Sequence, residues 1–241
     1  QNIEISIFGT GIHDPKSEKE FNLEKIRNIM EVNYFGTMNS INSIYDYYND
    51  KKSGQISIIS SVAGYRGLPA AGAYCASKSA LTSFAESLHF EMKRKNVRVS
   101  LVSPGFIKTP MTDQNDFPMP MIKSPEFAAE KIYTGLVKKK MFEIHFPKAF
   151  TYFLKFLKIL PSSIYFKVVE KFKDIEISIF STGIHDPKSE KKFNLDKVRK
   201  IMEVNYFGTM NCINAVYDYY SNKKSGQISI ISSVAGYRGL P

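Results

Sequence analysis

The chain has 241 residues, a net charge of +10, and 43% hydrophobic and 23% charged residues. These fractions are typical of a folded globular domain and exclude a wholly disordered or fibrous chain. Two cysteines exclude a disulfide-built scaffold and favour the reducing cytoplasm. No apolar run approaches the roughly 18 residues of a membrane-spanning helix. The length alone suggests one α/β domain.

Strand-like and helix-like segments alternate through the first 147 residues. Short β-prone runs predict strands at 3–8, 55–60, 97–102 and 141–146. Apolar residues at three- and four-residue spacing predict helices at 22–49, 73–95 and 125–138. This alternation is typical of a parallel sheet covered by helices on both faces. We therefore expect a Rossmann-like, doubly wound α/β fold.

The positive charge is concentrated in an aromatic-rich segment. Residues 138–173 contain nine lysines and two acidic residues, and residues 148–173 alternate aromatic and aliphatic residues with lysines. We interpret 148–173 as a basic amphipathic tail, and two roles stay open for it. It can lie on a membrane surface, or it can pack over the substrate pocket or a partner subunit. Nucleic acid is not expected, because no recognised binding module is present.

A long internal repeat divides the chain. Residues 3–69 recur as 175–241 without a gap, and ten of the 67 paired positions differ. Two copies of a long unit do not make a solenoid, which needs at least three. We therefore divide the chain into 1–147, the tail 148–173, and a truncated second copy at 174–241. Residues 175–180 could pair with strand 3–8, whose apolar edge would otherwise be exposed, or with another chain.

The strongest chemical signal lies at the start of the long predicted helix. Tyr74 and Lys78 are four residues apart and share one helix face. A free phenol has a pKa near 10, and a nearby ammonium favours its phenolate. This pairing suits acid–base chemistry near neutral pH. By itself, however, a YxxxK match more often marks a solvated helix face.

Three further motifs strengthen the catalytic interpretation. Ser61 closes the strand 55–60, thirteen residues before Tyr74, and Asn33 lies in the sequence NYFG of the helix 22–49. The strand 97–102 runs into SPGFIKTP, residues 103–110. In this order and spacing, the four motifs resemble the short-chain dehydrogenase/reductase family. The resemblance covers residues 3 to about 147, and 175–241 a second time.

The resemblance implies an NAD(P)-dependent oxidoreductase and a role for each motif. Tyr74 would be the general acid or base, with Lys78 favouring its phenolate and binding the nicotinamide ribose. Ser61 would orient the substrate oxygen, and Asn33 would hold a water that relays protons to Lys78. The cofactor would also contact Tyr74, Pro104, Gly105, Ile107 and Thr109, beside a mobile substrate lid at 110–124.

Two departures from the family pattern affect these expectations. The family's Asn-Asn-Ala-Gly turn is replaced by residues 8–11 (FGTG), which removes an Asn side chain expected to stabilise the sheet. The phosphate-binding pattern TGxxxGxG occurs nowhere in the 241 residues. We expect the first three strands to be missing and activity to be impaired, as if two adjacent similar genes had been joined by a deletion or an assembly error.

We therefore expect this chain to be either an enzyme or a catalytically inactive module. As an enzyme, the chain would act on an apolar ketone or secondary alcohol and would form a homo-oligomer if complete. As a module, it would serve only for structure or membrane-surface interaction. No metal site is expected, because the spacing of the four histidines suits neither a metal nor a catalytic triad. We expect packing or surface roles for these residues, which are His13, His89, His145 and His185.

Overall fold

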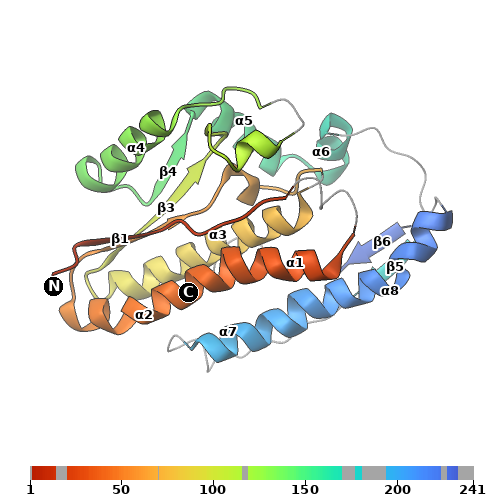
Figure 1. Cartoon of the computed structure of the whole chain (residues 1–241), viewed down its shortest axis with the longest axis horizontal. Coiled ribbons are helices and arrows are strands. Elements are labelled where there is room, and N and C mark those ends of the chain that lie inside the picture. The colour runs from red at the N-terminus through yellow and green to blue at the C-terminus, as the bar shows by residue number, and fades with distance from the viewer. Residues whose placement is uncertain are drawn as a thin grey trace.

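A four-stranded parallel sheet forms the centre of the computed structural model (Figure 1). The structure describes residues 2–14, 21–69, 71–115, 119–169, 177–180, 194–223 and 227–232. The strands follow one another in sheet order as β1 (Ile5–Phe8), β2 (Gln55–Ile59), β3 (Arg98–Pro104) and β4 (Glu143–Phe146). The α/β prediction is confirmed, and every predicted strand of the first copy overlaps an observed one.

Helices cover both faces of this sheet, as the alternation predicts. On one face lie α1 (Leu23–Met30), α2 (Gly36–Lys51) and α3 (Gly72–Lys93), with a π-helical turn, η2 (Glu31–Phe35), joining the first two. On the other face lie α4 (Pro125–Tyr133), its π-helical continuation η5 (Thr134–Lys138) and α5 (Lys148–Ile159). Two short 3₁₀ turns complete this region: η3 (Val62–Gly64) and η4 (Thr112–Gln114).

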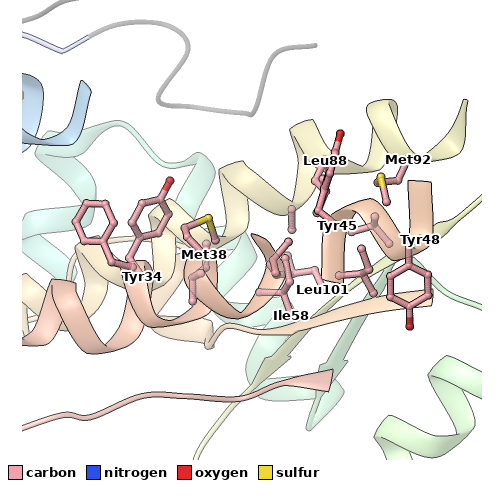
Figure 2. Packing of buried hydrophobic residues seen from close by; sticks show 14 of the residues in the cluster. Tyr34, Met38, Tyr45, Tyr48, Ile58, Leu88, Met92 and Leu101 are labelled. Atoms are coloured by element: carbon pink, nitrogen blue, oxygen red, sulfur yellow. The ribbon is translucent and has the colours of Figure 1, made fainter. Parts of the chain in front are cut away.

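The two larger parts of the core lie on opposite faces of the sheet, because successive strand residues point to opposite faces. Leu101 packs among α2 and α3 residues, whereas the next residue, Val102, packs against α4, η5 and β4 residues. Figure 2 shows the larger part, with eight residues labelled: Tyr34, Met38, Tyr45, Tyr48, Ile58, Leu88, Met92 and Leu101. Both faces of β2 and β3 are covered, so these strands are buried along most of their length, including the polar Gln55, Ser57 and Ser100.

Capping residues determine where several helices begin. The side chain of Asn22 accepts a hydrogen bond from the Lys25 amide at the start of α1, and Ser124 accepts one from the Phe127 amide before Pro125 opens α4. Both are preferred N-cap residues, and proline suits the first helical position. These local signals explain why the predicted helix starts lie within one residue of the observed ones.

The second copy forms a unit that repeats only part of the first. Its strands β5 (Ile177–Phe180) and β6 (Gln227–Ile230) make a separate two-stranded parallel sheet. Between them, α7 (Leu195–Met202), the π-helical turn η6 (Glu203–Phe207) and α8 (Gly208–Lys223) lie along the outside of α1 and α2 (Figure 1). The predicted pairing of β5 with β1 is wrong for the described residues, because β5 pairs with β6 as its counterpart pairs with β2.

The described part of the basic tail is helical and packs on the first copy. It comprises α5 and α6 (Ser162–Val169). Thr151, Leu157 and Tyr165 are buried, whereas Tyr152, Phe153, Phe156 and Ile159 are more than half exposed. Within the described residues, no helix is both long and apolar enough to cross a membrane. One face of α5 remains apolar and exposed. Both roles considered for the tail, packing over the substrate pocket or a partner subunit and lying on a membrane surface, stay predictions.

Candidate active site

Tyr74 and Lys78 lie on the first turns of α3, where the chain passes the carboxyl end of β2. The Lys78 ammonium is buried and donates a hydrogen bond to the Ile59 carbonyl at 3.2 Å. It lies 5.7 Å from the centroid of the half-buried Tyr74 ring. Burial lowers the pKa of Lys78 to about 8. The arrangement therefore places an ionisable ammonium beside a phenol at the end of a parallel strand.

The two consecutive serines at the end of β2 have different environments. Ser60 is buried, and its hydroxyl donates to the Lys78 carbonyl at 2.8 Å and contacts the Thr82 hydroxyl at 3.2 Å. Ser61 is half-buried and accepts a weaker 3.2 Å hydrogen bond from the Ala63 amide. Ser60 thus anchors α3 to the sheet, which leaves Ser61 as the better candidate for a substrate contact.

Asn33 connects three segments that meet beside Lys78. Its side chain, which is fully buried, accepts from the Ile12 amide at 2.6 Å and donates to the Ile12 carbonyl at 3.0 Å. It also donates to the Ser77 hydroxyl at 3.0 Å. These bonds position the loop after β1 against α3. The predicted water relay from Asn33 to Lys78 stays a prediction.

The π-helical turn η2 is a feature that periodicity did not predict. The sequence pattern indicates one continuous helix over 22–49, yet residues 31–35 around Asn33 are π-helical. Insertions of this kind are frequent at functional sites, because the widened turn redirects a side chain. The Thr37 hydroxyl donates to the Asn33 carbonyl at 2.8 Å, so this backbone carbonyl of the widened turn has a hydrogen-bond partner.

Gly11 allows the loop after β1 to approach Lys78 closely. A Cβ atom at this position would lie 3.2 Å from the Lys78 Nζ and 3.5 Å from the Asn33 Oδ1. A side chain here would crowd the ammonium. Gly11 is the last residue of the turn FGTG, which replaces the family's Asn-Asn-Ala-Gly turn. It therefore keeps space open beside the candidate catalytic lysine.

The predicted cofactor segment follows β3 and forms a tight loop. Gly105 donates from its amide to the Phe146 carbonyl at 2.8 Å, and a Cβ there would lie 3.1 Å from the Phe150 ring. The Thr112 hydroxyl donates to the Ile107 carbonyl at 2.7 Å and accepts from the Thr109 amide at 2.9 Å. The loop from Pro104 to Thr109 thus has a defined shape.

The predicted lid is described only in part. Ile107 forms an isolated parallel bridge with Lys123, which closes the base of the segment 110–122. Met121 and Ile122 are exposed and apolar. Residues 116–118 lie outside the described residues. The mobility of this segment stays a prediction.

Sequence reasoning missed one neighbour of Tyr74. The His13 and Tyr74 rings have centroids 4.5 Å apart and are tilted by 33°. Burial lowers the pKa of His13, opposed in part by Asp14. No short-range spacing could reveal this pair, because the loop after β1 brings together residues 61 positions apart.

His145, by contrast, has a packing role, as expected. It is buried on β4, with ring nitrogens 2.6 Å from the Thr151 hydroxyl and 2.9 Å from the Lys148 Nζ. Burial, followed by the charge of Lys155, lowers its pKa to about 4. Across the part of the chain that the structure describes, no group of three or more His, Cys, Asp or Glu side chains is placed to hold a metal ion.

A separate hollow lies away from these residues. It has a volume of about 1040 Å³ and lies between α3, β4 and the end of α5, with Tyr65, Ser79, Glu143 and Lys155 in its wall. Tyr74, Lys78, Ser61 and Asn33 do not line it. The candidate active site is therefore defined by the convergence of β2, α3 and the β1 loop rather than by this hollow.

Comparison with known proteins identifies the family. A family profile described as "short chain dehydrogenase" matches residues 1–118 and 162–241, so it matches most of the chain. An uncharacterized oxidoreductase of Myxococcus xanthus is 30% identical over 163 residues, which are 68% of this chain and 64% of that protein. A dehydrogenase/reductase SDR family protein 7-like of Drosophila melanogaster is 43% identical over 84 residues, 35% of this chain and 26% of that protein.

The fold comparison agrees with the sequence comparison. A short chain dehydrogenase from Burkholderia cenocepacia, crystallised in complex with NADP, superposes with a TM-score of 0.61 at 24% identity. The superposition covers 70% of each chain. The chain spans less than two thirds of the length of the two curated relatives above. The two matched stretches, 1–118 and 162–241, each contain one copy of the repeat, and the chain belongs to the short chain dehydrogenase family.

Proposed function

We propose that this chain contains the catalytic half of an NAD(P)-dependent oxidoreductase that interconverts a ketone and a secondary alcohol. The observation that supports this most is the buried Lys78 ammonium beside Tyr74 at the carboxyl end of β2. In open α/β sheets, ligands bind outside the carboxyl ends of the strands. The site therefore lies where the fold class expects a ligand.

Each residue has a role in the proposed reaction. The Tyr74 hydroxyl donates a proton to the substrate oxygen during reduction and accepts it back during oxidation. The Lys78 ammonium stabilises the phenolate that remains, and the Ser61 hydroxyl orients the substrate oxygen. Asn33 holds the β1 loop against α3 and so keeps Lys78 enclosed. When bound, NAD(P)H supplies the hydride that reaches the carbonyl carbon.

The residues present fit one end of the cofactor. Lys78 supplies donors for ribose hydroxyls, Gly11 leaves space beside its Nζ, and the loop from Pro104 to Thr109 borders the same strand ends. No TGxxxGxG turn occurs in the 241 residues, so no glycine-rich cradle is available here for the pyrophosphate. We infer that these residues bind the nicotinamide ribose weakly. We therefore expect the chain to convert its substrate slowly or not at all.

Saturation-transfer NMR with the two halves of the cofactor tests this proposal. We expect the chain to transfer saturation to the nicotinamide and ribose protons of nicotinamide mononucleotide, and to give little transfer to AMP. Lys78→Met removes the donors and should abolish the signal, while exposed Lys93→Met is the matched control. An unchanged signal in Lys78→Met, or binding of AMP alone, would contradict the proposal. If NADPH turnover with an apolar ketone is detected, Tyr74→Phe should lower it at least about 100-fold.

The second candidate is a catalytically silent fragment or fusion that serves for structure or membrane-surface contact. The exposed apolar residues of α5, with lysines on the same helix, favour it. Absence of nicotinamide binding together with flotation on anionic vesicles would support this alternative. Homo-oligomerisation, peripheral membrane contact and a cytoplasmic location stay predictions.

A further inference from the structure

The segment 62–69 leads from Ser61 at the end of β2 towards the start of α3, where Tyr74 lies. Ser61 caps the first turn of this segment, η3, by accepting a hydrogen bond from the Ala63 amide at 3.2 Å. Ala63 and Cys75 belong to one buried apolar cluster, and Tyr74 packs against that cluster. A movement of the segment therefore changes the surroundings of both candidate catalytic residues.

A first attachment joins this segment to the tail through Glu143 of β4. The buried Tyr65 donates from its hydroxyl to one oxygen of the Glu143 carboxylate at 2.9 Å. Lys155 of α5 donates to the other oxygen of that carboxylate at 2.5 Å. One carboxylate therefore connects the segment, the strand β4 and the helix α5, and bonds to a charged acceptor are stronger than bonds between neutral groups.

A second attachment involves the next two residues of the segment, Arg66 and Gly67. The Arg66 guanidinium donates to two backbone carbonyls at the end of α5, at 2.7 and 2.8 Å, and to the Ser162 hydroxyl at 3.2 Å. It lies 3.8 Å from the centroid of the Tyr165 ring of α6, and the Tyr165 hydroxyl donates to the Gly67 carbonyl. Because the guanidinium and the ring are planar, this attachment fixes the orientation of the segment as well as its distance.

Tyr165 also interacts with the residue that follows Tyr74. Its side chain is buried, and burial raises its pKa, an effect that Arg66 opposes and Cys75 increases. Electrostatic interactions of this kind act at short range inside a protein. One tail residue therefore lies close to both ends of the connection between the candidate serine and the candidate tyrosine.

We propose that the tail helices α5 and α6 clamp the segment 62–69, and that Tyr165 and Lys155 are positioning residues for Ser61 and Tyr74. The inference rests on the roles proposed above for Ser61 and Tyr74, whereas the clamp consists of contacts within this chain. Both tail residues act through the segment rather than on the substrate. Loss of either attachment lets the segment move away from α3, so that the serine and the tyrosine no longer keep a fixed separation, to which catalytic rates are sensitive.

The buried thiol of Cys75 provides a probe of the clamp that needs neither cofactor nor substrate. The chain contains two cysteines, so Cys212→Ser leaves Cys75 as the thiol that reacts. In this full-length background, the rate of reaction with 5,5′-dithiobis(2-nitrobenzoic acid) under native conditions measures how often the segment 62–69 opens. Hydrogen exchange of the same segment gives an independent measurement of the opening.

Two variants remove one attachment each. Tyr165→Phe loses the hydroxyl donor and keeps the ring, and Lys155→Met loses the ammonium that binds Glu143. We expect each variant to raise the rate of the Cys75 reaction by roughly three- to tenfold, as the loss of one hydrogen bond or partly buried ion pair implies. Ile164→Ala and Lys158→Met, at exposed positions of α6 and α5, are the matched controls and should change the rate less than about twofold.

The environment of Tyr74 separates positioning from general stabilisation. In the chain labelled with ¹³Cζ-tyrosine, the Tyr74 resonance is identified by its loss in Tyr74→Phe. We expect this resonance to shift or broaden in Lys155→Met, whose substituted side chain belongs to the tail, and to stay unchanged in Lys158→Met. A tail that only adds stability would lower the urea midpoint and leave the Tyr74 resonance of the folded protein unchanged.

An unchanged rate of the Cys75 reaction in either folded variant would overturn the inference, and so would an equal rise in the controls. Circular dichroism shows which variants are folded, and the two separate attachments keep the test decisive if one variant does not fold. Saturation transfer to nicotinamide mononucleotide decides the proposed function independently. Without such binding, raised Cys75 reactivity still supports the clamp, whereas binding together with unchanged reactivity overturns the clamp alone.

Discussion

Burial of the Lys78 ammonium in the candidate active site lowers the stability of the folded protein. Its ammonium is buried with one carbonyl partner, and burial lowers its pKa from 10.5 to about 8. The folded protein therefore holds this proton less tightly than the unfolded chain does. The penalty is complete below about pH 8 and disappears as the pH rises through 10.5, where the lysine is neutral in both states.

A pH-dependent comparison measures this penalty. We expect Lys78→Met to raise the free energy of unfolding at pH 7 by roughly 1–3 kcal/mol, because an apolar chain replaces a poorly solvated charge. The gain should shrink as the pH rises from 8 towards 10.5. Urea unfolding of both proteins at several pH values gives this difference. A gain that is constant with pH would contradict the assigned cause.

Asn33 and its counterpart Asn205 share a local sequence but not an environment. Asn33 is fully buried and bonded to Ile12 and Ser77, whereas Asn205 is half-buried. Asn33→Ala leaves two buried backbone groups of Ile12 without their partner. We expect it to cost about 2–3 kcal/mol of unfolding free energy, against less than about 1 kcal/mol for Asn205→Ala. Thermal and urea unfolding provide the measurement, and equal losses would show that local context alone determines the effect.

At the scale of elements, most of the first copy follows from local signals. Apolar periodicity predicts the helices to within a few residues, and the Asn22 and Ser124 caps and Pro125 lie at the observed starts of α1 and α4. The π-helical turns η2, η5 and η6 were missed, because apolar periodicity does not distinguish a π-helical turn from the α-helix that it continues. The predicted end of the strand 97–102 was two residues short, because Ser103 and Pro104 continue the register with β4.

The end of α5 is held by one residue from a distant loop. Arg66 donates to the carbonyls of Leu157 at 2.7 Å and Leu160 at 2.8 Å, and its guanidinium lies 3.8 Å from the centroid of the Tyr165 ring. Unpaired carbonyls at a helix C-terminus attract a cation, and the planar guanidinium serves several acceptors at once. The tail 148–169 therefore packs on the first copy partly through this contact.

Replacing Arg66 by lysine tests this capping. Arg66→Lys keeps the charge but loses the fork of donors and the planar stacking surface. We expect the free energy of unfolding to fall by about 1–2 kcal/mol, and hydrogen exchange in α5 and α6 to accelerate. Exposed Arg94 at the end of α3 provides the control, and Arg94→Lys should change neither quantity. Unchanged exchange in Arg66→Lys would exclude a capping role.

At the scale of the whole molecule, the sheets of the two copies differ in size and in how far helices cover them. The four-stranded sheet has helices on both faces, whereas β5 and β6 form a two-stranded sheet in the described residues. Two strands alone are marginally stable in water. We expect the second copy to depend on its contact with α1 and α2 and to open before the main sheet does.

Phe207 provides the test at this scale. Its side chain is completely buried, so Phe207→Ala should weaken the docking of the second copy by about 3 kcal/mol or more. Hydrogen exchange should accelerate in residues 194–223 and stay unchanged in β2 and β3. Ile231→Ala, at an exposed position of the same copy, should have no effect. Acceleration throughout the chain would show a single cooperative unit instead.

The sequence by itself determined the family resemblance, the repeat, the α/β class and the identity of the candidate residues. These depend on spacing along one helix or at one strand end, where a few residues carry the physical signal. Only the tertiary structure decided that Ser60 anchors α3, that His13 lies against Tyr74, and that Asn33 holds the β1 loop. It also decided that the second copy docks on helices rather than on a strand edge. Those outcomes depend on contacts between residues far apart in the chain, and local patterns do not encode such contacts.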